Sequence, residues 1–300
     1  MSEIPGWPIL FPADHAAREL ERRERRGELV RVRRGAYARI PRGSPLEQKT
    51  AQASARIHAV AAQLSDAVTV SHDSAALLWG LPLLGVPTRT HVIQRSRPGG
   101  HRDPTVVRHR MALEADEQTT LHGVRITTLE RTVVDCVCSM SARAGLVVAD
   151  AALRSGVDWE VIAALLDRRQ GRRGIAMARL VWQRADGGAE SPGETLTRAA
   201  LLDAGLPAVT TQIAVRTRRG TFRIDLGWPD WRVGIEFDGK VKYTSAMAGD
   251  SVDALFREKQ RHDALTEAGW RLLRVTWDDL RSPPTLAARA VRALRGEFGG

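Results

Sequence analysis

The stretch Phe222-Arg-Ile-Asp-Leu-Gly-Trp-Pro-Asp-Trp-Arg-Val-Gly-Ile-Glu-Phe-Asp238 decides the fold of the last third of the chain. Pro229-Asp230 is a turn-forming pair between two largely apolar runs, so we predict two antiparallel strands joined by a tight turn. Side chains alternate across a strand, which places Glu236 and Asp238 on one face, with Asp225 on the neighbouring strand. We therefore expect three carboxylates to converge on one spot.

These carboxylates predict a metal site. Two carboxylates on one side of a mostly apolar strand are costly to bury unless another group compensates their charge. A divalent ion is the obvious compensation, because Mg²⁺ binds a few carboxylate oxygens together with waters and substrate phosphate. We predict Mg²⁺, or Mn²⁺, with Asp225, Glu236 and Asp238 as its ligands.

The segments around this hairpin complete an α/β layer. Ser191 precedes a predicted helix with Glu194 three residues on, the spacing of a capping box. Further elements are expected as strands over 210–215 and 270–277 and a helix over 253–268. The order of helix, three strands, helix and strand predicts one mixed sheet flanked by helices. The small, turn-rich segment 186–193 is the predicted linker before it.

The N-terminal region has the sequence pattern of a small winged helix-turn-helix. A helix over 12–26 ends at Gly27, and a basic hairpin over 29–40 follows it. One helix and one hairpin do not make the complete motif. The arginines expected to contact DNA phosphates or grooves are Arg22, Arg23, Arg25, Arg26, Arg31, Arg33 and Arg34. Glutamates interleave with them at helical spacing, so a solvated charged helix is the alternative.

The middle region predicts further α/β structure. Helices are expected over 46–64, 127–135, 144–154, 158–168 and 173–184, and strands over 68–70, 90–94, 106–110 and 123–126. Ser71-His72-Asp73-Ser74 holds hydrolase-like residue types, but adjacency in sequence is not the geometry of a catalytic triad. His91, His101, His109 and His122 lack metal-ligand spacing and are expected as surface or core residues. Cys136 and Cys138, expected at or just past the end of the 127–135 helix, are interpreted as buried thiols.

Composition limits the class of protein. The 300 residues suffice for about two domains, and the two cysteines exclude a disulfide scaffold or a four-thiolate zinc site. No signal-peptide pattern or membrane-length apolar run is present, so we expect a cytoplasmic protein without a membrane partner. The net charge of +10 favours a polyanionic partner, nucleic acid first, over a merely solvated basic surface. Lysine is rare, yet three of its four positions lie between 240 and 259, which suggests a local need for a compact ammonium.

The C-terminal pattern resembles the very-short-patch-repair-like branch of the PD-(D/E)XK nuclease superfamily. The resemblance rests on the Glu194 helix, Asp225, Glu236-Phe-Asp238-Gly, Lys242-Tyr243, Glu258-Lys259-Gln-Arg261 and Gly269-Trp-Arg-Leu-Leu-Arg-Val-Thr-Trp277. The whole chain resembles actinobacterial AbiEi-type (type IV toxin–antitoxin) antitoxin-family proteins, through the segments that begin at Ser71 and Ile126. The resemblance implies three domains: a winged helix over 1–43, a central antitoxin-like α/β domain over 44–186 and a restriction-endonuclease-like domain over 190–300.

The resemblance assigns roles to particular residues. Asp225 matches the strand aspartate, Glu236 the acidic position of the (D/E)XK strand, and Glu194 the acid of the first helix. Asp238 stands where the superfamily has lysine, so Lys242 or Lys259 is expected to supply the ammonium from another backbone position. Pro229-Asp230 is a literal Pro-Asp, which we interpret as the hairpin turn and not as part of the site.

The implied activity is metal-assisted hydrolysis of DNA phosphodiester bonds. Glu194, Asp225, Glu236, Asp238 and a lysine would form the catalytic group, and Arg223 and Arg261 would hold flanking phosphates. The expected partners are DNA and a cognate toxin gene or protein, in phage defence or toxin–antitoxin control. The alternative is a catalytically inactive regulator or antitoxin that binds operator DNA through the same fold.

Overall fold

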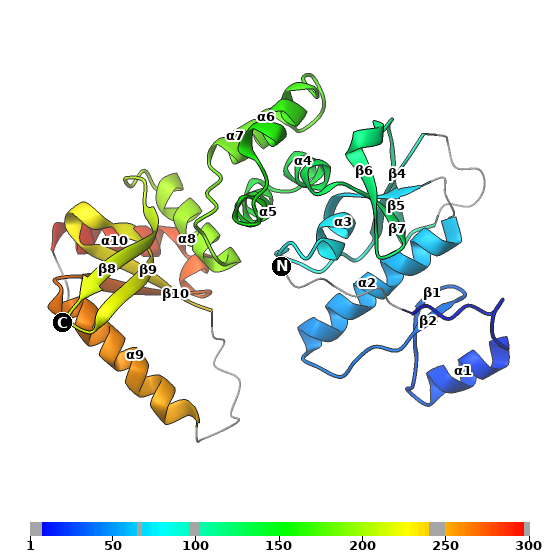
Figure 1. Ribbon diagram of the computed structural model, residues 1–300, viewed down its shortest axis with the longest axis horizontal. Helices are drawn as coiled ribbons and strands as arrows, with labels where there is room; N and C mark the ends of the chain where they lie inside the picture. The colour runs from blue at the N-terminus through cyan, green and yellow to red at the C-terminus, as the bar shows by residue number, and fades with distance from the viewer. Residues whose placement is uncertain (1–7, 65–67, 96–102, 240–249, 297–300) are drawn as a thin grey trace. The chain divides into compact units, whose positions relative to one another are not determined.

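The chain folds into two compact units, residues 1–185 (unit 1) and 186–300 (unit 2). The computed structural model describes residues 8–64, 68–95, 103–239 and 250–296 (Figure 1). Both units combine helices with a sheet, so the predicted α/β class is confirmed. The unit boundary falls at the predicted linker, whereas the regions predicted as 1–43 and 44–186 lie together in unit 1.

Unit 1 begins with a helix and a hairpin. These are α1 (Ala17–Arg25), β1 (Val30–Arg33) and β2 (Ala36–Ala38), with Gly35 at φ 68° in the turn. Gly lacks the Cβ that disfavours this left-handed conformation, which explains the sharp reversal. Leu20, Leu29 and Tyr37 form their small core, and β1 packs beside α2 (Pro45–Leu64). The predicted helix and hairpin are both confirmed.

The rest of unit 1 is a five-stranded sheet with helices around it. The strand order is β5-β4-β3-β7-β6, in which β4/β5 and β3/β7 are parallel. The strands are β3 (Thr69–Val70), β4 (Thr90–Gln94), β5 (Val106–Arg110), β6 (Gln118–Leu121) and β7 (Val124–Thr127). The helices are α3 (His72–Leu78), α4 (Leu129–Ser139), α5 (Ala142–Arg154), α6 (Trp159–Asp167) and α7 (Ile175–Gln183). Ile57, Val70, Val92 and Ile126 lie in its fully buried core.

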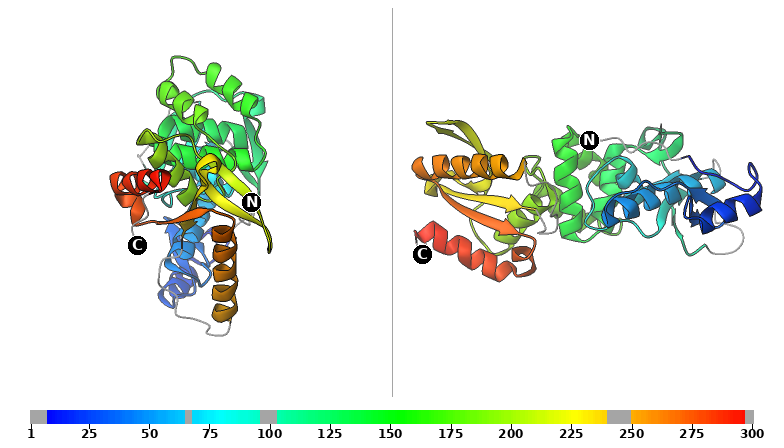
Figure 2. Two further views of the ribbon diagram at one scale, coloured as in Figure 1. Left: turned by 90° about the vertical axis from the view of Figure 1, so that its left-hand side faces the viewer. Right: turned by 90° about the horizontal axis from the view of Figure 1, so that it is seen from below.

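Unit 2 is a four-stranded mixed sheet between helices. The order is β11-β10-β9-β8, with β10 and β11 parallel and the other pairs antiparallel. Helices α8 and α10 share one apolar cluster with the sheet and α9 another, and Figure 2 shows α9 and α10 on opposite faces. The elements are α8 (Pro192–Asp203), β8 (Thr210–Thr217), β9 (Gly220–Trp228), β10 (Val233–Asp238), α9 (Asp250–Glu267), β11 (Arg271–Thr276) and α10 (Pro283–Arg295). The predicted mixed sheet is confirmed.

Three details differ from the predictions. Strand β6 and helix α10 were not predicted; β6, Gln118-Thr-Thr-Leu121, is short and mostly polar, and it is held by pairing with β7. The helix predicted over 127–135 runs on to Ser139, so Cys136 and Cys138 lie inside it. Cys136 is buried and Cys138 half-buried, and burial raises the pKa of the Cys138 thiol to about 11. Both thiols are therefore protonated at neutral pH.

Candidate functional site

The carboxylates predicted as catalytic come from three elements of unit 2. Glu194 lies in the first turn of α8, Asp225 on β9, and Glu236 and Asp238 on β10. Strands β9 and β10 are joined by the short 3-10 turn Pro229–Trp231, which confirms that Pro229-Asp230 forms the hairpin turn. The register pairs Ile235 with Leu226, which brings Asp225 beside the C-terminal half of β10.

Asp225 and Glu236 are held by different contacts. Asp225 Oδ2 accepts a hydrogen bond of 2.9 Å from the backbone N–H of Phe237. Glu236 Oε1 forms an ion pair of 2.5 Å with Nη1 of Arg261, which lies on α9. Arg261 also donates from Nη2 to the backbone carbonyl of Arg223 at 2.5 Å. Among the described residues, the cation that pairs with Glu236 is thus a guanidinium.

Glu194 is fixed at the N-terminus of α8. Its Oε1 accepts a 2.7 Å hydrogen bond from Ser191 Oγ, and its Oε2 accepts one of 2.8 Å from the backbone N–H of Glu190. Ser191 Oγ in turn accepts from the N–H of Glu194 at 3.2 Å, so the predicted cap is present. These contacts hold a nearly buried carboxylate toward the sheet.

The three acids disturb one another electrostatically. Burial raises the pKa of Glu194, Asp225 and Glu236, because it disfavours the charged form. The charge of Asp225 raises the pKa of both Glu194 and Glu236 further, while Arg261 opposes the shift at Asp225 and Glu236. Asp225 therefore acts electrostatically on both other acids, but in the described part of the chain the three do not form a group of ligand atoms within 4.8 Å of one another. Perturbed acids of this kind mark candidate functional sites.

The remaining residues predicted for this site lie at the edge of the three acids or outside the described residues. Asp238 is half-buried and lies 3.9 Å from Nη1 of Arg274 on β11. Lys259 is exposed on α9, two residues before Arg261 and hence about 160° away around the helix. It forms no ion pair with any carboxylate that the structure describes. Lys240 and Lys242 fall outside the described residues, so the prediction that Lys242 supplies the ammonium stays a prediction.

Most arginines predicted to contact DNA already have a protein partner. Arg22 pairs with Glu19 and Arg23 with Glu28, which also lies 3.9 Å from Arg26. Arg33 pairs with Asp103, a contact that ties the hairpin to the region before β5. Arg25 donates to the carbonyl of Glu21, whereas Arg31, Arg34 and Arg223 are exposed. The predicted contacts with DNA phosphates therefore fit best the two exposed arginines of the hairpin, Arg31 and Arg34.

Two histidines that we expected as surface or core residues, His91 and His109, come together with His72 in unit 1. His72, His91 and His109 each offer a ring nitrogen, and these nitrogens lie within 4.8 Å of one another. They are the group of three potential metal ligands that meets this distance within the described part of the chain. His72 follows β3, His91 lies on β4 and His109 on β5, so spacing in the sequence gave no signal for the cluster.

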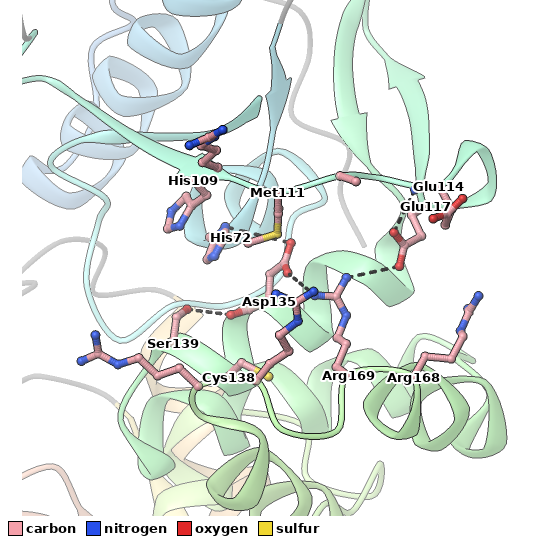
Figure 3. A pocket seen from close by; sticks show the side chains of 14 residues that line it. His72, His109, Met111, Glu114, Glu117, Asp135, Cys138, Ser139, Arg168 and Arg169 are labelled. Atoms are coloured by element: carbon pink, nitrogen blue, oxygen red, sulfur yellow. Dashed lines mark hydrogen bonds and ion pairs between the residues drawn. The ribbon is translucent and has the colours of Figure 1, made fainter. Parts of the chain in front are cut away.

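The histidine cluster lies at a pocket of about 930 Å³. His72, His109 and Asp135 line this pocket, with arginines from the loop after α6. Figure 3 shows the two imidazoles side by side, with Asp135 and Arg169 beneath them. Burial lowers the pKa of His72 to about 2, helped by the other imidazoles, and burial lowers the pKa values of His91 and His109 to about 4. All three rings are uncharged at neutral pH.

Ser71, His72 and Asp135 do not form a catalytic triad. Ser71 Oγ lies 2.9 Å from His72 Nδ1, and Asp135 Oδ2 lies 4.0 Å from the same nitrogen. A triad needs the serine and the carboxylate on opposite ring nitrogens, so that one receives a proton while the other is held. A serine-hydrolase role for this segment has no geometric support.

Comparison with known proteins gives relatives along nearly the whole chain. No protein-family model matches it. "Uncharacterized protein MT2308" and "Uncharacterized protein Rv2248", from two strains of Mycobacterium tuberculosis, are each 31% identical over 284 residues, covering 92% of this chain and 96% of the relative. The chain belongs to their family. Since the match covers 92% of the chain, the family contains both units.

A solved structure is also similar to this member of the mycobacterial family. The crystal structure of the RV2827C protein from Mycobacterium tuberculosis covers 68% of this chain and 78% of its own, at 17% identity and a TM-score of 0.37. Within the described residues, no helix of the family member is both long and apolar enough to cross a membrane.

Proposed function

We propose that the protein binds DNA and that unit 2 is a metal-dependent DNA phosphodiesterase of the PD-(D/E)XK type. The observation that carries the proposal is that Asp225 on β9 lies beside Glu236 on β10, with its Oδ2 accepting a hydrogen bond from the N–H of the next residue, Phe237. A stable sheet alone gives no reason to place Asp225 beside the partly buried Glu236, because each charge is costly to bury. A divalent ion that binds there would offset this cost.

The carboxylate oxygens of Asp225 and Glu236 are the kind of ligand that Mg²⁺ and Mn²⁺ bind. Arg261 pairs with Oε1 of Glu236 and Phe237 donates to Oδ2 of Asp225, which leaves the other oxygen of each carboxylate for an ion. Both are hard oxygen ligands of the kind that Mg²⁺ prefers, and waters and a phosphate would complete its shell. Asp225 and Glu236 would hold the ion, with Asp238 at the margin.

The side chains around the acids support this chemistry. A bound Mg²⁺ supplies Lewis-acid activation of a phosphate and of a water. Glu194, held by Ser191 and the backbone of Glu190, would serve as the group that accepts a proton from the attacking water. Exposed Arg223 lies on the strand beside the acids and would hold a flanking phosphate.

DNA binding is assigned to the basic surfaces of both units. In unit 1 the exposed Arg31 and Arg34 of the hairpin would contact phosphates, as expected of a wing. The net charge of +10 supports a polyanionic partner. The resemblance to AbiEi-type antitoxins supports a role in phage defence or toxin–antitoxin control. Co-expression with a nucleotidyltransferase-like toxin from a neighbouring gene tests this role, and relief of toxicity is the expected result.

The test of the nuclease is plasmid nicking by the full chain with Mg²⁺ or Mn²⁺. Wild type is expected to nick supercoiled plasmid, and Asp225→Asn and Glu236→Gln are each expected to reduce the rate at least about 100-fold. Asp230→Asn is the matched control, because Asp230 is an exposed acid of the hairpin turn. This variant is expected to nick plasmid at the wild-type rate. Nicking that survives in Asp225→Asn contradicts the proposal.

A DNA-binding regulator with an inactive nuclease fold is the second candidate. The ion pair of Arg261 with Glu236 favours it, because a guanidinium already neutralises one of the acids. Asp238 also favours an inactive regulator, because it stands where the superfamily has lysine. If the protein retards DNA in a gel at low salt but does not nick it with Mg²⁺ or Mn²⁺, it is such a regulator.

A further inference from the structure

We propose that His72, His91 and His109 bind a divalent transition-metal ion, with Zn²⁺ the preferred ion, at the wall of the pocket in unit 1. The site is built from described residues of unit 1 alone and does not depend on the carboxylates of unit 2. Imidazole nitrogen is a preferred ligand of Zn²⁺, and three protein ligands with one open position is the arrangement of a catalytic-type zinc site.

The sheet brings two of the ligands together. His91 on β4 and His109 on β5 lie on adjacent parallel strands, where Ile93 pairs with His109 and His91 with Val107. His91 and His109 are thus two positions out of register, and both side chains project from the same face. Their Nδ1 and Nε2 atoms are 3.1 Å apart. Two nitrogens bound to one tetrahedral Zn²⁺ at about 2.0–2.1 Å lie about 3.3 Å apart, so this spacing already suits the ion.

The third ligand comes from a constrained position. His72 opens α3 with φ 55°, a left-handed conformation that costs energy for a residue with a Cβ. Strained backbone of this kind is typical of functional positions. The conformation holds the His72 ring 3.7 Å from that of His109, centroid to centroid. Because the two rings are stacked, the ion would turn His72 so that its nitrogen points at the ion shared with the other two.

A carboxylate lies near a ring nitrogen of two of the three histidines. Asp73 Oδ1 lies 3.8 Å from His91 Nε2, the nitrogen that faces away from His109. Asp135 Oδ2 is buried, has no hydrogen-bond partner among the described residues, and lies 4.0 Å from His72 Nδ1. Metal-bound histidines usually donate their second N–H to a carboxylate, which orients the ring and strengthens the ligand. A small turn of His72 would give Asp135 the partner that it lacks.

The surrounding charges and space are compatible with an ion. Arg131 and Arg169, whose charges act on His72, pair with Glu117 and Asp135, so their charge is largely neutralised. The pocket that His72 and His109 line gives the ion a path from solvent and room for a fourth ligand.

The experiment titrates Zn²⁺ into the tag-free, chelator-stripped full chain in competition with a chromophoric chelator. Wild type is expected to bind one equivalent tightly, and His91→Gln and His109→Gln each at least about 100-fold more weakly. His262→Gln is the matched control, because His262 is exposed on α9. Glu236→Gln shows whether the zinc binds in unit 2, and both controls are expected to bind as wild type does.

Two further readouts separate a lost ligand from a lost fold. Co²⁺ bound to wild type is expected to give visible d–d bands that are absent in His109→Gln. Saturating Zn²⁺ should raise the thermal unfolding midpoint of unit 1 in wild type but not in His109→Gln, because only wild type binds it in the folded state. Equal zinc affinity in wild type and both histidine variants, or a zinc site abolished by Glu236→Gln alone, overturns the proposal.

Discussion

The backbone N–H of Phe237 donates its hydrogen bond to the side chain of Asp225, at 2.9 Å from Oδ2, and not to a carbonyl of β9. The backbone pairing of β9 with β10 runs from Val233 to Ile235 and is not continued at Phe237. A carboxylate thus bridges the two strands where their ladder ends. This bridge fixes Asp225 beside Glu236 and leaves its second oxygen for another ligand.

Asp225→Asn should stabilise unit 2 while it abolishes nicking. Burial raises the pKa of Asp225 in the folded state, so folding favours the protonated carboxyl. The stability that the protonated carboxyl contributes is fully present below pH 3.8 and is lost as pH rises through the folded pKa. At pH 7 the ionised Asp225 is therefore unfavourable, whereas an amide oxygen still accepts from Phe237. We expect a thermal midpoint a few degrees above wild type at pH 7, with a smaller difference near pH 4. Calorimetry measures both, and a lower midpoint at pH 7 contradicts the pKa argument.

Gly193→Ala should disrupt the candidate active site without changing any of its side chains. A Cβ at Gly193 would lie 1.9 Å from Cε1 of Phe237, whose ring packs edge-on against Trp277. Relief of this clash must shift the Phe237 ring, which follows Glu236, or the first turn of α8, which carries Glu194. We expect a loss of about 1–3 kcal/mol in unfolding free energy and a strong loss of nicking.

The matched control for that variant is Gly239→Ala. A Cβ there meets Phe237 at 3.5 Å, an ordinary contact, so the unfolding free energy should change little. Chemical denaturation of both variants measures the difference. Equal stability of Gly193→Ala and wild type would mean that α8 does not approach β10 as closely as described.

Arg131→Met should be among the most damaging changes in unit 1. The Arg131 guanidinium is fully buried and pairs with Glu117 at 2.7 Å and Asp135 at 2.9 Å. Its removal leaves Arg169, at 3.2 Å from Glu117 and 3.8 Å from Asp135, as the remaining described cation beside the two carboxylates, so we expect a cost at the lower end of about 3–5 kcal/mol. Arg168→Met is the control, because Arg168 lies 3.9 Å from Asp116 at the surface and should cost at most about 1 kcal/mol. Urea unfolding of both variants gives the comparison.

His58 should make unit 1 sensitive to acid. Burial lowers the pKa of His58 in the folded state, and its Nδ1 contacts the carbonyl of Ser54 at 2.9 Å. The unfolded chain then binds a proton below pH 6.5 that the folded chain does not, so stability falls as pH falls, by up to about 1.4 kcal/mol per pH unit for this one group. His58→Asn keeps a donor near Ser54 and cannot titrate. Its stability should fall less steeply between pH 6.5 and 5, and identical slopes would count against the assignment.

The order of elements was largely predictable because it depends on local patterns. Alternation and turn residues place β9 and β10 around Pro229-Asp230, and Ser191 with Glu194 marks the start of α8. Strand β6 escaped prediction because its residues are mostly polar and pairing with β7 holds it. The capping residues and the apolar periodicity act over a few positions, so they can be read without knowledge of the fold.

The amino-acid sequence alone determined the α/β class and placed Asp225, Glu236 and Asp238 on adjacent strands of one hairpin. Only the tertiary structure decided that Arg261, and not Lys259, reaches Glu236, because that depends on which side of α9 faces the sheet. Only the tertiary structure assembled His72, His91 and His109, since their meeting depends on strands β3, β4 and β5 lying side by side. Contacts between residues far apart in the chain are set by packing, which no short-range pattern records.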